Sequence, residues 1–453
     1  MNEKKNRSSF SSGIGFVLAA AGSAVGLGNL WRFPYLAAQY GGGVFIVIYI
    51  IIALTFGFAL MTTEIAIGRK TGKSPLVAYG ELNKKFKFLG LLACIVPIII
   101  LPYYSVIGGW VIKYMTTFVT GNGIAAADDA FFGGFIGATG APLGFFAIFL
   151  GLTAVIILCG VNKGIERVSK VLMPILLILA IVICIFVATM DGAGAGIKYY
   201  LVPDMARFSW KAIPAAMGQI FYSMSLAMGI MITYGSYTKK ETNLVKSVNQ
   251  IEIFDTIVAI LAGLMVIPVV YMVSGAEGTA SSGPGLMFVA LPKVFEAMPM
   301  GGVIGALFFI LVLFAALTSS ISLMEAIISC FMDKFKIGRV PACIICIIIC
   351  LLLGVPSSMG FGAWGHILPL GMDFLTFFDW ISNSVLMPIV ALLTCILVGY
   401  FVKPKVILDE ITRNGEKLSR KGLYIVMVKV VAPICLAIIL VTYTLAQFGV
   451  FSM

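Results

Sequence analysis

Two apolar stretches of the sequence are interrupted by residues that weaken a helix and free main-chain groups for binding. The first stretch holds Gly22, Gly26 and Gly28 just before Asn29, and each glycine costs a helix about 1 kcal/mol relative to alanine. The second reads Ser-Met-Ser-Leu-Ala-Met-Gly over 223–229, and small hydroxylic residues can satisfy a broken backbone inside a membrane. Both patterns indicate a binding site within a span. The alternative, that small residues only permit close helix packing, stays open.

A lone carboxylate, Asp255, lies in the middle of another apolar stretch. An unpaired carboxylate at that depth costs several kcal/mol, so we expect a functional role. The alternative is that the stretch begins later along the chain, which would place Asp255 at the membrane surface.

Cysteine and histidine usage argues against several kinds of catalysis. All nine cysteines lie in apolar stretches, where a thiol behaves as a small apolar group. Cys343, Cys346 and Cys350 share a helix face without a histidine or carboxylate, so a metal site is not expected there. His366 is the only histidine and falls in a loop, which argues against a Ser–His hydrolase. We expect that the protein is not an enzyme and carries no cofactor.

The elements that position these residues are membrane-spanning helices. The chain has 453 residues, of which 60% are hydrophobic and only 11% charged, whereas soluble domains carry about 25% charged residues. Eleven segments are long and apolar enough to cross a bilayer: 13–38, 42–68, 88–118, 143–160, 168–188, 213–236, 246–274, 303–332, 340–355, 374–402 and 423–448. The sequence therefore predicts an all-α protein of the cell membrane, in contact with lipid.

The basic residues predict its orientation. Most of the 31 lysines and arginines fall between spans on the side that holds the N-terminus, which the positive-inside rule makes cytoplasmic. The tryptophans lie near the opposite ends of spans, as an interfacial belt would: Trp31, Trp110, Trp210, Trp364 and Trp380. We expect the N-terminus inside and the C-terminus outside. The net charge of +11 is thus explained without a nucleic-acid partner.

The two interrupted segments are the first and the sixth along the chain. In two halves of five helices these positions correspond, as in transporters built from inverted repeats with a site at the bilayer midplane.

Several motifs, in order, resemble the neurotransmitter:sodium symporter family over residues 7 to 402. They are Gly22-Ser-Ala-Val-Gly-Leu-Gly-Asn-Leu-Trp-Arg-Phe-Pro-Tyr35, Gln219-Ile-Phe-Tyr-Ser-Met-Ser-Leu226, Ser282-Gly-Pro-Gly-Leu286 and Leu317-Thr-Ser-Ser-Ile321. The resemblance, to a bacterial amino-acid branch with eleven helices, implies inverted repeats of helices 1–5 and 6–10 with helices 1 and 6 unwound. It divides the chain into an inner segment 1–12, repeats 13–188 and 189–402 with an outer lid loop 275–297, and a cytoplasmic loop with an eleventh helix over 403–453.

The resemblance implies two sodium sites. The first would use Ala24, Asn29, Ser223 and Asp255, and the second Gly22, Val25, Ala315, Thr318 and Ser319. The family usually has asparagine where this chain has Asp255, and chloride-dependent members have a serine where it has Ala259. We therefore expect Asp255 to supply the negative charge that chloride supplies elsewhere.

The resemblance also implies a site for a neutral hydrophobic or aromatic L-amino acid. Gly26 replaces an aspartate that holds amines in monoamine transporters, so the substrate should bring its own carboxylate, facing Tyr104 and the amides of Leu27 and Gly28. The full set of expected substrate residues is Ser23, Ala24, Gly26, Leu27, Gly28, Ile100, Tyr104, Tyr222, Ser223, Ser225, Met228, Ser319 and Leu323.

Gates are expected on both sides of the site. Arg32 and Asp379 match the family's outer ion pair, and Arg7 and Asp333 match the inner pair near Tyr237. The expected function is sodium-coupled import by alternating access. A channel or a non-transporting sensor on the same fold is the alternative, and the sequence does not decide between monomer and dimer.

Overall fold

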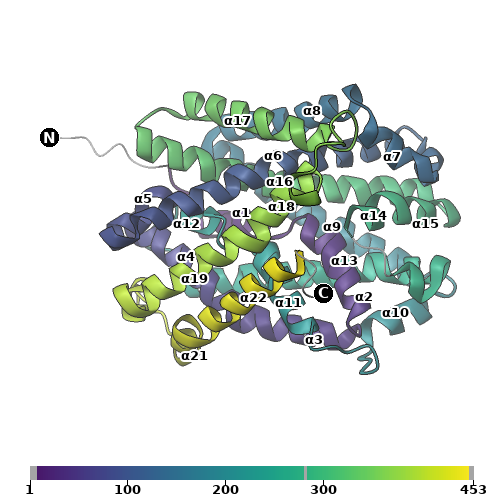
Figure 1. Ribbon diagram of the computed structural model, residues 1–453. Coiled ribbons are helices and arrows are strands. Elements are labelled where there is room, and N and C mark those ends of the chain that lie inside the picture. The colour runs from purple at the N-terminus through teal and green to yellow at the C-terminus, as the bar shows by residue number, and fades with distance from the viewer. Residues whose placement is uncertain (1–7, 280–282, 448–453) are drawn as a thin grey trace.

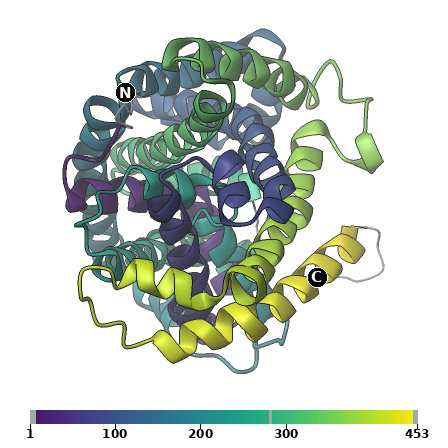
Figure 2. The same ribbon diagram turned by 90° about the vertical axis from the view of Figure 1, so that its left-hand side faces the viewer.

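The described chain is helical throughout. The computed structural model describes residues 8–279 and 283–447, and within these ranges the only strand-like pairing is a single bridge between Gly42 and Pro203. The long helices run side by side across Figure 1, and Figure 2 looks along them from one end.

Nine helical spans in the described ranges are long and apolar enough to cross a membrane. Several are one helix with a π-helical turn inside, which is typical of functional sites. The spans are α3–α4 (Gly43–Thr71), α6 with its preceding turn (Lys84–Val119), α8 (Gly140–Leu158), α9 with its preceding turn (Val161–Ala188), α13 (Leu244–Gly278), α16 (Gly301–Phe335), α17 (Arg339–Met359), α18–α19 (Phe374–Val402) and α21–α22 (Lys421–Gln447).

The first and sixth expected spans are broken, as the sequence predicts. Helix α1 (Gly13–Ala24) and the pair η1–α2 (Gly28–Gln39) meet at a bend of 53° and together form a tenth span. The sixth is two short helices, α11 (Ala212–Ser223) and α12 (Ile230–Ser236), each too short to cross alone. Eleven crossings, their sidedness and the repeat boundaries stay predictions.

Short helices cover the two ends of the bundle. Helix α5 (Pro75–Leu82) lies at the end where the described chain begins, and α7 (Asp129–Gly137), α10 (Ala193–Leu201) and α15 (Leu291–Ala297) lie at the opposite end (Figure 1). In its described residues the segment expected as a lid loop is largely helical: α13 reaches Gly278 across a non-helical kink at Gly275, and α14 (Gly283–Gly285) is followed by a π-helical turn (Leu286–Ala290) and α15. The remaining short helix, α20 (Pro404–Ile411), packs against α4 (Phe58–Thr71).

The broken helices form the centre of the bundle. Helix α1 packs against α9, α13 and α16, while α11 packs against α3 and α12 against α4. Helices α6 and α16 pack along each other beside them. This arrangement brings side chains from α6, α13 and α16 to the two breaks.

Candidate functional site

The two helix breaks lie against each other. Helix α1 ends at Ala24, and α11 ends at Ser223. The Ser225 hydroxyl donates to the Ser23 carbonyl over 2.9 Å, and the Ser23 hydroxyl lies 3.0 Å from that of Ser225. Ser225 has φ of 52° and Ala227 of 61°, a left-handed conformation that costs roughly 1–2 kcal/mol for a residue with a side chain.

A glutamate of a neighbouring helix holds this strained segment. Glu64 on α4 accepts the Ala227 amide over 2.7 Å, and its second oxygen is buried without a partner. The sequence analysis missed Glu64, although a carboxylate among apolar residues is the signal that singled out Asp255.

A central cavity lies between the breaks, α6 and α16, with about 20 Å³ of free space. All the predicted substrate residues except Leu27 line it, and Leu27 is buried beside it. Asn29 and Ile230 also line it, and Ile230 was not predicted. The lining residues are Ser23, Ala24, Gly26, Gly28, Asn29, Ile100, Tyr104, Tyr222, Ser223, Ser225, Met228, Ile230, Ser319 and Leu323.

The hydroxyl-bearing side chain of Tyr104 lines the cavity. The Tyr104 hydroxyl is buried beside Ser319 and the Leu27 amide, and it makes no hydrogen bond of standard geometry with the described residues. It faces Gly26, where an added Cβ would lie 3.2 Å from the Tyr104 hydroxyl and 2.9 Å from that of Ser319. A buried unsatisfied donor is costly, so this hydroxyl is available for a ligand that fits beside Gly26.

Asp255 is joined to the break by hydrogen bonds. Its Oδ1 accepts from the Asn29 amide over 2.8 Å and from the Ser223 hydroxyl over 2.7 Å. Its Oδ2 accepts from the Tyr49 hydroxyl over 3.0 Å. The structure thus brings together three of the residues expected at the first sodium site and adds Tyr49 from α3 (Gly43–Ile52).

The Asp255 carboxylate has neutral partners only. It is fully buried, and no lysine or arginine in the described ranges forms an ion pair with it. A buried carboxylate without a counter-charge is unfavourable until a cation or a proton neutralises it. The oxygens around it suit a hard cation such as sodium.

Several residues predicted for the second sodium site lie close to Ser319. The Ser319 hydroxyl lies 3.5 Å from the Gly22 carbonyl and 3.4 Å from that of Val25. The neighbouring Thr318 hydroxyl donates to the carbonyls of Phe314 and Ala315 in its own helix. The Ser319 hydroxyl thus lies among the main-chain oxygens at the end of α1, whereas the Thr318 hydroxyl is bonded within α16.

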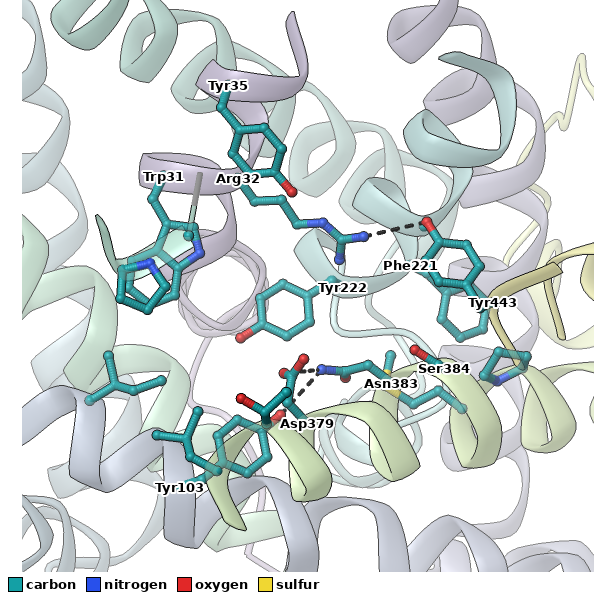
Figure 3. Close-up of a pocket in the computed structure, with 18 of the residues that line it drawn as sticks. Trp31, Arg32, Tyr35, Tyr103, Phe221, Tyr222, Asp379, Asn383, Ser384 and Tyr443 are labelled. Atoms are coloured by element: carbon teal, nitrogen blue, oxygen red, sulfur yellow. Dashed lines mark hydrogen bonds between the residues drawn. The ribbon is translucent and has the colours of Figure 1, made fainter. Parts of the chain in front are cut away.

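A larger vestibule of about 440 Å³ adjoins the central cavity, and Tyr222 lines both. Arg32 and Asp379, the predicted outer pair, both line this vestibule, with Tyr222 between them in Figure 3. No salt bridge joins them in the described part of the chain. Asp379 instead accepts from the Asn383 amide over 2.6 Å.

On the opposite side of the site lies an ion pair that could not be predicted from the sequence. Arg339 forms a bidentate pair with Glu325 at 2.6 and 2.9 Å, and the Tyr237 hydroxyl donates to Glu325 over 2.6 Å. Phe10 donates its amide to the Tyr237 carbonyl over 3.0 Å. The chain start is thereby attached to α16 through α12.

The predicted inner pair is described only in part. Arg7 lies outside the described residues, and Asp333 accepts from the Ser74 amide over 2.6 Å. Tyr237, expected near this pair, bonds to Glu325 of the same helix as Asp333.

The chain matches known proteins over nearly its whole length. The model of the sodium:neurotransmitter symporter family matches residues 7–124 and 135–451. An uncharacterized sodium-dependent transporter, YhdH of Bacillus subtilis, is 34% identical over 440 residues, which are 95% of this chain and 96% of that protein. The sodium- and chloride-dependent GABA transporter ine of Drosophila melanogaster is 26% identical over 462 residues, covering 90% of this chain and 47% of that protein.

Solved structures share the fold. The crystal structure of MhsT in complex with L-phenylalanine superposes with a TM-score of 0.87 at 35% identity, covering 97% of this chain and 100% of that one. Sequence, fold and site agree, and this chain belongs to the sodium:neurotransmitter symporter family, whose members are sodium-coupled membrane transporters and not enzymes.

Proposed function

We propose that this protein couples inward sodium flow to the import of neutral hydrophobic or aromatic L-amino acids across the cell membrane, without chloride. The observation that carries the proposal is the buried Asp255 carboxylate, which has only neutral hydrogen-bond partners and lies at the edge of the central cavity. A sodium ion beside it supplies the missing positive charge.

The two ends of the cavity differ in chemistry. The free Tyr104 hydroxyl and the amides of Leu27 and Gly28 suit the carboxylate of a substrate, together with the first sodium ion. The carbonyls of Ala24, Tyr222 and Ser225 would then receive its amino group. The sodium ion and the substrate thus share one site, so each binds more tightly when the other is present.

The walls favour an apolar side chain. Ile100, Met228 and Leu323 line the cavity, and a flexible methionine adapts to ligands of several shapes. Each methylene is worth only about 1–3 kcal/mol of discrimination in such a pocket, so we expect broad specificity. The L-phenylalanine bound in the MhsT crystal structure supports this class.

Chloride independence follows from the charge of Asp255. Curated relatives such as the Drosophila GABA transporter are described as sodium- and chloride-dependent. A protein that carries its own buried carboxylate next to the sodium site does not need an external anion there.

A competition panel tests the substrate class. Radiolabelled L-phenylalanine bound to the purified protein in sodium should be displaced by leucine, methionine, tyrosine and tryptophan. Glutamate and lysine should fail, because each would bury an unpaired charge. Displacement by an acidic or basic amino acid at the lowest concentrations of the panel would overturn the assignment.

A channel would show no saturable binding of the amino acid, and a sensor would bind the amino acid without transporting it.

A further inference from the structure

Arg32 is held by a residue of the last helix. Its Nη2 donates to the hydroxyl of Tyr443 on α22 (Ala432–Gln447) over 3.5 Å. Figure 3 shows this contact on the far side of the guanidinium from Asp379. Asp379 is held separately, by Asn383, which in turn donates to the Tyr103 hydroxyl over 3.2 Å.

The approach of Tyr443 depends on a missing side chain. A Cβ added to Gly218 of α11 would lie 2.6 Å from the Tyr443 hydroxyl and 3.4 Å from Nη2 of Arg32. Gly218 therefore leaves the space in which the phenol and the guanidinium meet. Since α11 is the first half of the broken sixth span, this contact joins both broken helices to α22.

We propose that Tyr443 is a positioning residue for the outer gate: it holds Arg32 away from Asp379 while the vestibule is open. Closing the gate exchanges this long bond from the guanidinium to a neutral phenol for an ion pair with a carboxylate, which is intrinsically stronger because both partners are charged. The proposal rests on the proposed function, because it assigns Arg32 and Asp379 to a gate that opens and closes in each cycle.

The hydrogen bond between Tyr443 and Arg32 must be weak, because the gate has to close in each cycle. A net hydrogen bond contributes about 1 kcal/mol, which is about a fivefold change in an equilibrium. Removing the Tyr443 hydroxyl should therefore shift the open–closed equilibrium about fivefold toward the closed state.

The test measures vestibule opening without substrate. Ser384 lines the vestibule and would be replaced by cysteine as a reporter, in a protein whose exposed Cys159 is changed to serine. A membrane-impermeant maleimide then labels the reporter in sodium buffer. Tyr443→Phe should slow labelling by up to about fivefold. Tyr443→Glu should instead keep or raise the labelling rate, because a carboxylate holds Arg32 more strongly in the open position.

Thr442→Ala is the matched control, since the Thr442 hydroxyl bonds only to carbonyls of its own helix, and its labelling rate should equal the parent's. The proposal is overturned if Tyr443→Phe labels within twofold of the parent, or if both Tyr443 variants slow labelling alike, as general damage to α22 would. Because no amino acid is present, this result is independent of the substrate assignment, which uptake by the parent protein tests separately.

Discussion

Asp255 brings a full negative charge to the break in the first helix, and its four-residue cluster with Asn29, Tyr49 and Ser223 leaves that charge uncompensated by the protein. A neutral amide at the same position would accept and donate hydrogen bonds but would attract a cation far less. In the proposed sodium site, the charge of Asp255 is therefore expected to set the affinity for sodium.

Asp255→Asn should raise the sodium concentration needed for half-maximal uptake at least about tenfold. Two unit charges 4 Å apart interact by roughly 4 kcal/mol at an effective dielectric constant of 20, so the loss is large even after partial compensation. The measurement is the sodium dependence of uptake, with Asp191→Asn on an exposed carboxylate as the control. An unchanged sodium dependence would contradict the role given to Asp255.

Tyr104→Phe should raise the KM for the amino acid about fivefold, the effect of one net hydrogen bond. The Tyr104 hydroxyl makes no hydrogen bond of standard geometry with the described residues and only adjoins Ser319 and the Leu27 amide, so stability should fall little. Tyr424→Phe provides the contrast, because that hydroxyl lies 2.8 Å from the Thr63 hydroxyl away from the cavity. Tyr424→Phe should lower the unfolding temperature and leave KM unchanged. If Tyr104→Phe instead lowered the unfolding temperature without changing KM, Tyr104 would not contact the substrate.

At the residue scale, the sequence predicts nearly all the lining of the central cavity. The lining residues follow from the resemblance to the family, and Asp255, which bonds to two of them, is identifiable by its charge. Partners such as Tyr443 for Arg32, or Arg339 for Glu325, could not be predicted. Each pair comes from separate helices, and only their packing brings the two side chains together.

At the scale of elements, the breaks in α1 and α11–α12 create the site. Gly26 has no side chain where a Cβ would crowd both Ser319 and Tyr104, and Glu64 bonds the strained turn at Ala227. Helix propensity and spacing predict where these breaks fall, since glycines and serines interrupt otherwise apolar runs. The helical content of the lid segment was not predicted, because its short runs carry no clear period.

Gly26→Ala should raise KM more than about tenfold. Its methyl group would lie 2.9 Å from the Ser319 hydroxyl and 3.2 Å from that of Tyr104, so it enters the space expected for the substrate carboxylate, and overpacking typically costs about 1–3 kcal/mol. Gly144→Ala is the control, because nothing lies within 4 Å of its added Cβ. Equal KM values for the two variants in an uptake assay would show that Gly26 does not border the substrate.

At the scale of the whole molecule, a vestibule lies on one side of the central cavity, while on the other the Glu325–Arg339 pair and Phe10 connect the surrounding helices. Alternating access requires this asymmetry to reverse in each cycle. Each inward sodium ion contributes roughly 2.3 kcal/mol per 100 mV and about 1.4 kcal/mol for a tenfold gradient. Two ions would thus drive roughly 7 kcal/mol of accumulation.

Sodium-coupled import without chloride is best tested by uptake of radiolabelled L-phenylalanine into proteoliposomes. The assay uses an inward sodium gradient, an imposed interior-negative potential and gluconate in place of chloride. We expect L-phenylalanine to accumulate above its external concentration. This accumulation should rise with the potential, vanish when potassium replaces sodium, and persist in gluconate. Equilibration without accumulation, or accumulation that needs chloride, would contradict it.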